Sequence, residues 1–410
     1  MKKKIWLLLV LVLVLACAAG YFIFKKPADV QIDEKHFPDS AFREAVMELD
    51  PDHDGILSAE EIKGINYIDI HGRKIENLQG VEYLTELTNL CAYENKLTEV
   101  DISHNKMLER LFLYDNQLTK LDVSHNTELV YLNCWNNRLT ELDVSRNTKL
   151  YSLQIGFNGL TELNVRENAE LIQLECHRNQ LTELDVSRNA KLESLEAWGN
   201  QLTELDVSRN VELSSLYCNE NQIREIDFSR NRKMIQANVS GCEIKNFDLS
   251  LYPDLWGFIC EGCGLMELDV SKNPKLYQLI CSDNELTDLN LSKNPKLEVL
   301  ECSNNQLTQL DLSNNPLVKR LECDGNKLTK LDISCCPKLV ERVNGAIAEE
   351  KDGSIEWNLP DDTSRYVYER FVMRTDKNVE VIKDAGTEQG TTGRVTHIKV
   401  FAGREERAAV

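Results

Sequence analysis

The sequence is short of positive charge. Its 410 residues include 47 Lys and Arg against 67 Asp and Glu, which gives a formal net charge of −20 at pH 7 and a pI of about 4.9. A chain this acidic is repelled by phosphate backbones, so general nucleic-acid binding is excluded. Histidine is scarce as well. The seven histidines are scattered along the chain, which argues against a zinc enzyme.

Catalytic motifs are also missing. The sequence has no nucleophile elbow, no phosphate-binding loop and no paired histidines with a carboxylate at metal-ligand spacing. We therefore expect that the protein is not an enzyme. With 42% hydrophobic and 28% charged residues, the chain still has the composition of a folded protein with a core.

Only one long apolar run is present, at residues 5–24, and lysine clusters flank it on both sides. Twenty residues in a helix span about 30 Å, which is enough to cross a bilayer. Residues 1–26 are therefore predicted to be an uncleaved signal anchor in the cell membrane. Two alternatives stay open: a lipoprotein signal, because residues 14–17 resemble a bacterial lipobox ending at Cys17, and a cleaved signal peptide. All three place the rest of the chain on the extracellular side.

A repeat of 21 residues fills most of the chain. It recurs twelve times without insertion between Thr85 and Cys336, as in KMLERLFLYDNQLTKLDVSHN (106–126) and PKLEVLECSNNQLTQLDLSNN (295–315). When each repeat is numbered from 1, apolar residues fall at positions 3, 6, 8, 13, 16 and 18, and Asn usually occupies positions 11 and 21. The first half reads L-x-x-L-x-(L/C)-x-x-N-x-L, and the second half is a near copy of it.

This pattern resembles the 21-residue leucine-rich repeats of bacterial surface proteins. The resemblance implies a leucine-rich repeat solenoid, which is a β-rich stack of parallel coils. One coil cannot bury its own leucines, so only the array is stable. We expect Asn side chains to hydrogen-bond the backbone of the adjacent turn. The predicted segments are a short helical cap at 27–64, the solenoid at 65–343 and a small β-rich cap or domain at 344–410.

Cysteine is frequent, but its spacing does not indicate a disulfide framework. Seven of the thirteen cysteines share position 8, an inward position where other repeats carry Leu, Ile, Val or Ala, so we interpret them as small buried hydrophobic residues. Two more replace the Asn of position 11. The position-8 cysteines are Cys134, Cys176, Cys218, Cys260, Cys281, Cys302 and Cys323, and the position-11 cysteines are Cys242 and Cys263.

One motif predicts a metal site. Residues 50–61, DPDHDGILSAEE, resemble an EF-hand calcium loop, D-x-D-x-D-G-x5-E. The resemblance implies a structural Ca²⁺ that orders the N-terminal cap. Since EF-hands usually pair and only one loop is visible, we expect weak affinity. The implied ligands are Asp50, Asp52, Asp54, the carbonyl of Ile56, Ser58 through water, and Glu61.

A row of aromatic residues is the candidate binding face. In leucine-rich repeats the side chains of positions 5, 7 and 9 point outward from the strand on the concave side. In the first half of the array these positions are rich in aromatic residues, and Tyr and Trp are frequent in the centres of interfaces. The alternative is that the rings only stack on one another. The predicted contact residues are Tyr93, Phe112, Tyr114, Tyr131, Trp135, His177, Trp198 and Tyr217.

These features together predict an exported, membrane-anchored bacterial protein that mediates protein recognition or adhesion at the cell surface. Its partner is expected to be an extracellular protein. Two alternatives are a glycan-binding surface protein, because Tyr and Trp also stack on sugars, and a structural spacer that displays the C-terminal unit.

Overall fold

A computed structural model describes residues 29–242, 248–351, 354–358 and 371–383. The chain divides into two compact units, Met1–Gly159 and Leu160–Val410. The predicted anchor at 1–26, with Cys17, lies outside the described residues. Within the described ranges, no helix is long and apolar enough to cross a membrane.

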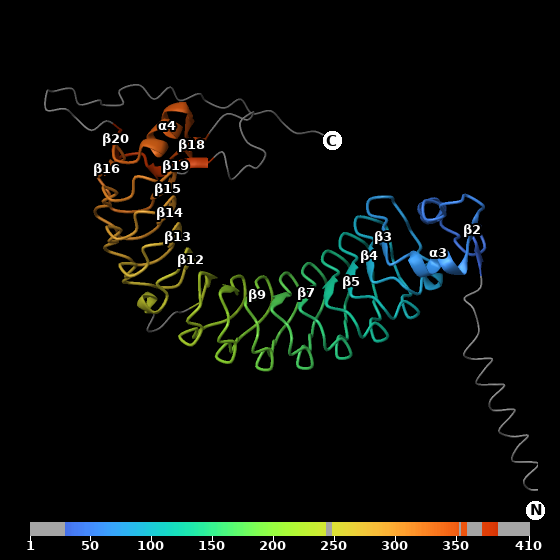
Figure 1. Ribbon diagram of the computed structural model, residues 1–410. Coiled ribbons are helices and arrows are strands. Elements are labelled where there is room, and N and C mark those ends of the chain that lie inside the picture. Colours follow the sequence, from blue (N-terminus) through green and yellow to red (C-terminus); the bar gives the residue numbers. More distant parts are fainter. Residues whose placement is uncertain (1–28, 243–247, 352–353, 359–370, 384–410) are drawn as a thin grey trace, which may run out of the picture. The chain divides into compact units, whose positions relative to one another are not determined.

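Both units are stacks of coils, and each coil contributes one three-residue strand at repeat positions 5–7 (Figure 1). Neighbouring strands within a unit are parallel and pair one full repeat apart, as Leu111 does with Leu132. The first unit contains β3 (Tyr67–Asp69), β4 (Asn89–Cys91), β5 (Arg110–Phe112), β6 (Tyr131–Asn133) and β7 (Ser152–Gln154). The second contains β8 (Gln173–Glu175), β9 (Ser194–Glu196), β10 (Ser215–Tyr217), β11 (Gln236–Asn238), β12 (Gly257–Ile259), β13 (Gln278–Ile280), β14 (Val299–Glu301) and β15 (Arg320–Glu322).

The leucines of each coil form the core. Leu108, Leu111 and Leu113, at positions 3, 6 and 8 of one repeat, are completely buried. Burying a leucine side chain contributes about 1.5–3 kcal/mol, so the packing of successive coils, rather than the short strands, provides most of the stability. The predicted parallel, β-rich solenoid is confirmed.

Two ladders of asparagine hold neighbouring coils together. Asn116, at position 11, donates from Nδ2 to the carbonyl of Ala92 (2.9 Å), and its Oδ1 accepts from the backbone N–H of Leu97 (3.0 Å). Asn126, at position 21, donates to the carbonyls of Ile102 and Asn105 (3.0 and 2.9 Å). Because these bonds satisfy backbone groups of the preceding coil, the structure explains the repeated Asn without any role in binding.

At two positions where the sequence departs from Asn, another side chain makes the corresponding bond. Tyr252 occupies position 21, and its hydroxyl donates to the carbonyl of Phe228 (2.9 Å), 24 residues earlier, as the Asn side chains do. Cys263 occupies position 11, and its Sγ lies 3.4 Å from the carbonyl of Val239, also 24 residues earlier. At both positions the replacing side chain brings a donor to the carbonyl that Asn would otherwise bind.

A helical cap precedes the first coil, as predicted. It is anchored by Asp39, the N-cap of its first helix, whose carboxylate also accepts from the backbone N–H groups of Glu76 and Asn77 (2.8 and 3.2 Å). Phe37 packs so closely against Gly80 that a Cβ there would lie 2.3 Å from its ring. The elements are β1 (Val30–Gln31), α2 (Ser40–Met47), β2 (Ile56–Leu57), α3 (Ala59–Gly64) and η1 (Val81–Tyr83).

The C-terminal segment covers the last coil of the second unit. β19 pairs in parallel with β15, and β18 and β17 follow it as antiparallel neighbours. β-rich structure was predicted here, but helix α4, which spans the predicted end of the solenoid at residue 343, was not. Residues 352–353, 359–370 and 384–410 of this segment lie outside the described residues. The elements are η2 (Leu249–Leu251), β16 (Lys330–Asp332), α4 (Pro337–Gly345), β17 (Ile347–Lys351), β18 (Ser354–Asn358), β19 (Phe371–Asp376) and β20 (Glu380–Ile382), the last paired with β16.

Candidate functional site

The side chains at positions 5, 7 and 9 form the surface that we call the strand face. Successive residues of a strand point to opposite sides. In β5, Leu111 is buried in the core, whereas Arg110 is exposed and Phe112 is half-buried. The leucine at position 6 fixes the coil, so positions 5, 7 and 9 are free to vary in chemistry.

The strand face of the first unit begins with a stack of three rings. The His71 and Tyr93 ring centroids are 4.6 Å apart, and those of Tyr93 and Tyr114 are 4.3 Å apart, with planes within 12° of parallel. His71 was not predicted, because the first coil does not follow the 21-residue spacing: Ile68 pairs with Leu90, 22 residues later. Tyr93 therefore has a ring on each side of it.

A second group of rings lies on the following coils of the first unit. Trp135 meets Phe157 edge to face, with centroids 5.2 Å apart. The Arg110 guanidinium lies 5.1 Å from the ring centroid of Tyr131, which is the geometry of a cation–π contact. Phe157 was not predicted, since it lies at position 10, beside the strand face, but its ring is 40% exposed.

The strand face of the second unit has its own aromatic group. His177 stacks on Trp198, with centroids 4.7 Å apart and planes 5° from parallel. The Arg178 guanidinium lies 4.9 Å from the same indole and forms an ion pair with Glu220 (2.6 Å). Gly199 leaves room for Arg178, because a Cβ there would lie 2.9 Å from its Cδ.

The structure brings the predicted contact residues onto the strand face, in two separate groups. Tyr93, Phe112, Tyr114, Tyr131 and Trp135 belong to the first unit, and His177, Trp198 and Tyr217 belong to the second. All are half-buried except His177, which is only 6% exposed. His177 therefore packs against the Trp198 ring and contributes little exposed surface of its own.

The predicted calcium loop folds as a tight turn between α2 and α3. Gly55 (φ +80°) and His53 (φ +59°) adopt left-handed backbone conformations that turn the chain back on itself. Carboxylate oxygens of Asp50, Asp52 and Asp54 lie within 4.8 Å of one another. Three carboxylates at that spacing are a suitable donor set for a hard divalent cation.

Two further features of this loop bear on its function. β2, which contains Ile56, pairs antiparallel with β1, so a strand just before α2 takes the place that a second loop fills in paired EF-hands. Glu61 forms a capping box with Ser58, and its Oε2 accepts from the Ser58 N–H (2.7 Å). The hydrogen bond from the Asp54 N–H by itself would lower the pKa of Asp52. The nearby carboxylates of Asp50, Asp54 and Glu61 outweigh that effect and raise this pKa.

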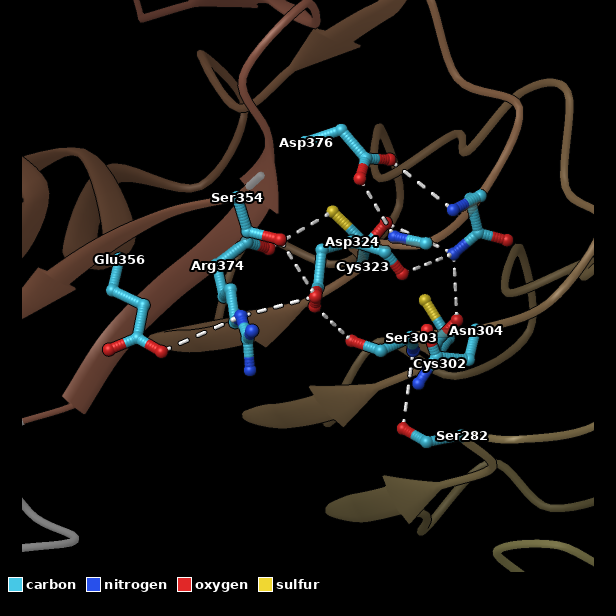
Figure 2. A network of polar contacts seen from close by, with 12 residues as sticks. Ser282, Cys302, Ser303, Asn304, Cys323, Asp324, Ser354, Glu356, Arg374 and Asp376 are labelled. Atoms are coloured by element: carbon cyan, nitrogen blue, oxygen red, sulfur yellow. Dashed lines mark hydrogen bonds and ion pairs between the residues drawn. The ribbon is translucent and has the colours of Figure 1, made fainter. Parts of the chain in front are cut away.

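At the C-terminal end of the second unit the strand face is polar and internally bonded (Figure 2). Asp324 is buried, and its carboxylate accepts from the hydroxyls of Ser303 (2.6 Å) and Ser354 (3.0 Å). Arg374 on β19 lies 3.1 Å from the same carboxylate. These bonds tie the C-terminal strands to the last coils of the solenoid.

A carboxylate pair lies on the same polar face. Glu301 and Glu322 are paired residues of β14 and β15, and Arg320 bridges them with ion pairs of 2.8 and 3.1 Å. Burial, with the negative charge of Glu322, raises the pKa of Glu301 to about 7, although Arg320 opposes the shift.

The position-8 cysteines are all buried, as predicted. Four of them, Cys260, Cys281, Cys302 and Cys323, follow one another in consecutive coils. Burial raises the pKa of each thiol, to about 12 for Cys281 and Cys323. Protonated buried thiols are inert, so they act as packing residues.

Comparison with solved structures identifies the family. The functional domain of InlJ from Listeria monocytogenes is 31% identical to the chain, in an alignment that covers 82% of this chain and 86% of that domain, with a TM-score of 0.62. The chain belongs to the internalin family of leucine-rich repeat proteins. The InlJ domain is described as including a cysteine ladder.

More distant structures share the fold. Internalin InlF from Listeria monocytogenes is 22% identical, covering 76% of this chain and 89% of its own, with a TM-score of 0.60. A leucine-rich repeat protein of Leptospira interrogans is 24% identical, covering 61% of this chain and 69% of its own, with a TM-score of 0.55. No protein-family model matches the chain, and no curated protein matches it.

Proposed function

We propose that this internalin is an exported, membrane-anchored surface protein whose strand face recognises an extracellular protein. The observation that carries the proposal is the row of half-buried, mutually stacked aromatic rings at positions 5, 7 and 9. Nothing in the coil requires aromatic residues there, because the buried leucines and the asparagine ladders already hold it together. Pre-stacked rings lose little conformational entropy on binding, which favours their use in an interface.

A protein partner fits the geometry better than a glycan. Sugars bind aromatic rings through the flat face of the ring. Tyr93 lies between His71 and Tyr114, and Trp198 is covered by His177 and approached by Arg178. The faces of these rings are therefore covered by neighbouring side chains, with an arginine beside Trp198, and such a surface suits the mixed polar and apolar chemistry of a protein interface.

Export and anchoring rest on the N-terminal sequence. The apolar run at 5–24 between two lysine clusters supports a signal anchor, with lipidation at Cys17 as the alternative. A surface location also suits a binding scaffold without enzyme chemistry. Labelling of intact cells with a membrane-impermeant lysine reagent tests this part: modification of the solenoid supports it, and protection until lysis contradicts it.

The calcium loop completes the proposal. Asp50, Asp52, Asp54 and Glu61 would hold Ca²⁺, with the Ile56 carbonyl and a water on Ser58 filling the remaining positions. The ion would neutralise the clustered carboxylates that raise the pKa of Asp52. Because Asp39 of the same cap bonds directly to the first coil, ordering the cap would also protect the end of the leucine core.

Thermal melting tests the calcium site. Calcium should raise the melting temperature of the wild-type chain, because a ligand that binds only the folded state stabilises it. The double variant Asp50→Ala, Glu61→Ala should lose this effect. As a matched control, Glu44→Ala with Glu86→Ala removes two exposed carboxylates outside the loop and should keep it. A wild-type melting curve that calcium does not change would end the calcium proposal.

Paired arrays of extracellular proteins and of glycans test the partner class. The full chain, in detergent and calcium, should bind a protein, and Trp135→Ala with Trp198→Ala should lose that binding. A glycan hit that depends on the same residues would replace the protein proposal. If a protein binds wild type and the double variant equally well, its binding site lies outside the strand face. The strand face would then be interpreted as part of a structural spacer.

A further inference from the structure

Three potential metal ligands meet on the strand face of the second unit. Glu175 ends β8 and Glu196 ends β9, and the two residues are direct partners in the parallel sheet. His177 lies two residues beyond Glu175 on the same face. One nitrogen of His177 and one oxygen of each glutamate all lie within 4.8 Å of one another. His177 Nδ1 and Glu196 Oε2 are 3.4 Å apart.

The same sheet contains a matched pair for comparison. Glu301 and Glu322 occupy the same repeat positions on β14 and β15, and the arginine of position 5, Arg320, bridges them. In the coil that carries Glu196, position 5 is Ser194, which brings no charge. Like charges opposite each other in a sheet are destabilising. The side chain near both carboxylates is the imidazole of His177 at β8 and β9, whereas it is the guanidinium of Arg320 at β14 and β15.

The imidazole is held in a fixed position. His177 is 6% exposed, and its ring is stacked flat on Trp198. A buried ring packed in this way has little freedom to turn, so its distance to Glu196 is set by the fold.

We propose that Glu175, His177 and Glu196 form a binding site for a divalent transition metal, with Zn²⁺ as the best fit. Zinc binds imidazole nitrogen and carboxylate oxygen, whereas calcium and magnesium take oxygen ligands. In a tetrahedral zinc site with bonds of about 2.1 Å, neighbouring ligand atoms are about 3.4 Å apart, which is the separation of His177 Nδ1 and Glu196 Oε2. Three protein ligands leave a fourth position for water or for a carboxylate of a bound molecule.

Cobalt binding tests the site, because Co²⁺ occupies zinc sites and has visible absorption. The full chain, in detergent and with excess calcium to fill the acidic loop, should bind about one Co²⁺, and Zn²⁺ should displace it. His177→Asn and Glu196→Gln should each weaken binding about tenfold or more. His71→Asn is the matched control, since His71 holds the equivalent position beside a single carboxylate, Asp69, and it should change nothing.

A second readout does not depend on whether those variants fold. Bound Co²⁺ quenches a nearby indole, and Trp198 stacks on His177 at 4.7 Å. Saturable quenching should therefore disappear in Trp198→Phe and persist in Trp135→Phe. The proposal is overturned if the wild-type chain shows no saturable Co²⁺ binding, if the ligand variants bind as tightly as wild type, or if quenching survives in Trp198→Phe.

Discussion

The strand face of the first unit and the strand face at the C-terminal end of the second unit are built from the same kind of repeat, but their side chains differ in chemistry. In the first unit, rings such as Tyr93 and Trp135 stack along the coils and stay half-buried. Near the C-terminus the same positions hold Ser303, Glu322 and Asp324, whose polar groups are bonded within the chain. Polar residues on the strand face are thus not by themselves evidence of a binding surface, since here their polar groups already bond to other residues of the chain.

The difference follows from what each end must do. The last coil would expose its leucines and strand edge, so the polar network fastens β19 and β18 over it. The helical cap of the first unit contacts the first coils through Asp39 and Phe37, which lie outside the strand face. The four predictions below, ordered from the largest expected effect to the smallest, test this division.

Removing Asp324 should have the largest effect. Asp324→Ala leaves Arg374 and two serine hydroxyls without their shared acceptor, and breaking a buried ion pair of this kind costs about 3–5 kcal/mol. We expect β19 and β18 to lose hydrogen-exchange protection. Asp311→Ala, which removes an exposed carboxylate in the same unit, should cost much less. Equal protection in both variants would mean that the network does not hold the cap.

Glu301 should make stability depend on pH. Its pKa of about 7 lies above the value of an unfolded glutamate, so the folded state binds more protons between about pH 4.5 and 7, and stability falls as pH rises through that range. Glu301→Gln should therefore be more stable than wild type at pH 8, by about 3 kcal/mol, and nearly equal at pH 5. Urea unfolding at both pH values measures this, and a constant difference would refute it.

The four buried cysteines of consecutive coils should behave as hydrophobic packing residues. Cys302→Ser buries a hydroxyl among apolar side chains and should destabilise the chain by about 1–3 kcal/mol. Cys302→Ala should cost only about 1 kcal/mol. Denaturant unfolding under reducing conditions compares the two, and a serine variant as stable as the alanine variant would show that the site is not apolar.

Truncating a ring of the first unit should have the smallest effect on folding. Tyr93→Ala removes a stacked ring but no core contact, so we expect a loss of about 1 kcal/mol. Its neighbour Leu90, at position 6 on β4, is the control, because Leu90→Ala should cost about 2–5 kcal/mol. If both substitutions cost the same, the rings are structural and not reserved for a partner.

Much of the fold could be predicted because the repeat fixes it. Leucine at position 6 and Asn at positions 11 and 21 recur so regularly that one coil predicts the others. Helix α4 was missed because it begins immediately after the last repeat, where periodicity gives no information. The substitution of Tyr252 for Asn is readable as a ladder bond only when the Phe228 carbonyl is seen beside it.

The candidate site was predicted only in part. The aromatic positions follow from the repeat numbering, but His71 lies in a coil with a 22-residue step, and Phe157 lies at position 10. The burial of His177 depends on Trp198, one coil away. The meeting of His177 with Glu175 and Glu196 requires side-chain directions on two coils, which spacing alone does not give.

The most direct test of the central claim is the affinity of Trp135→Ala for a protein partner found with the wild-type chain. We predict binding weaker by about 5- to 150-fold, or about 1–3 kcal/mol, with a loss of folding stability of no more than about 1 kcal/mol. Trp256→Ala is the control: this indole is 45% exposed but lies at position 4, outside the strand face, and it should bind like wild type. Equal affinity of Trp135→Ala and wild type would contradict recognition through the aromatic face.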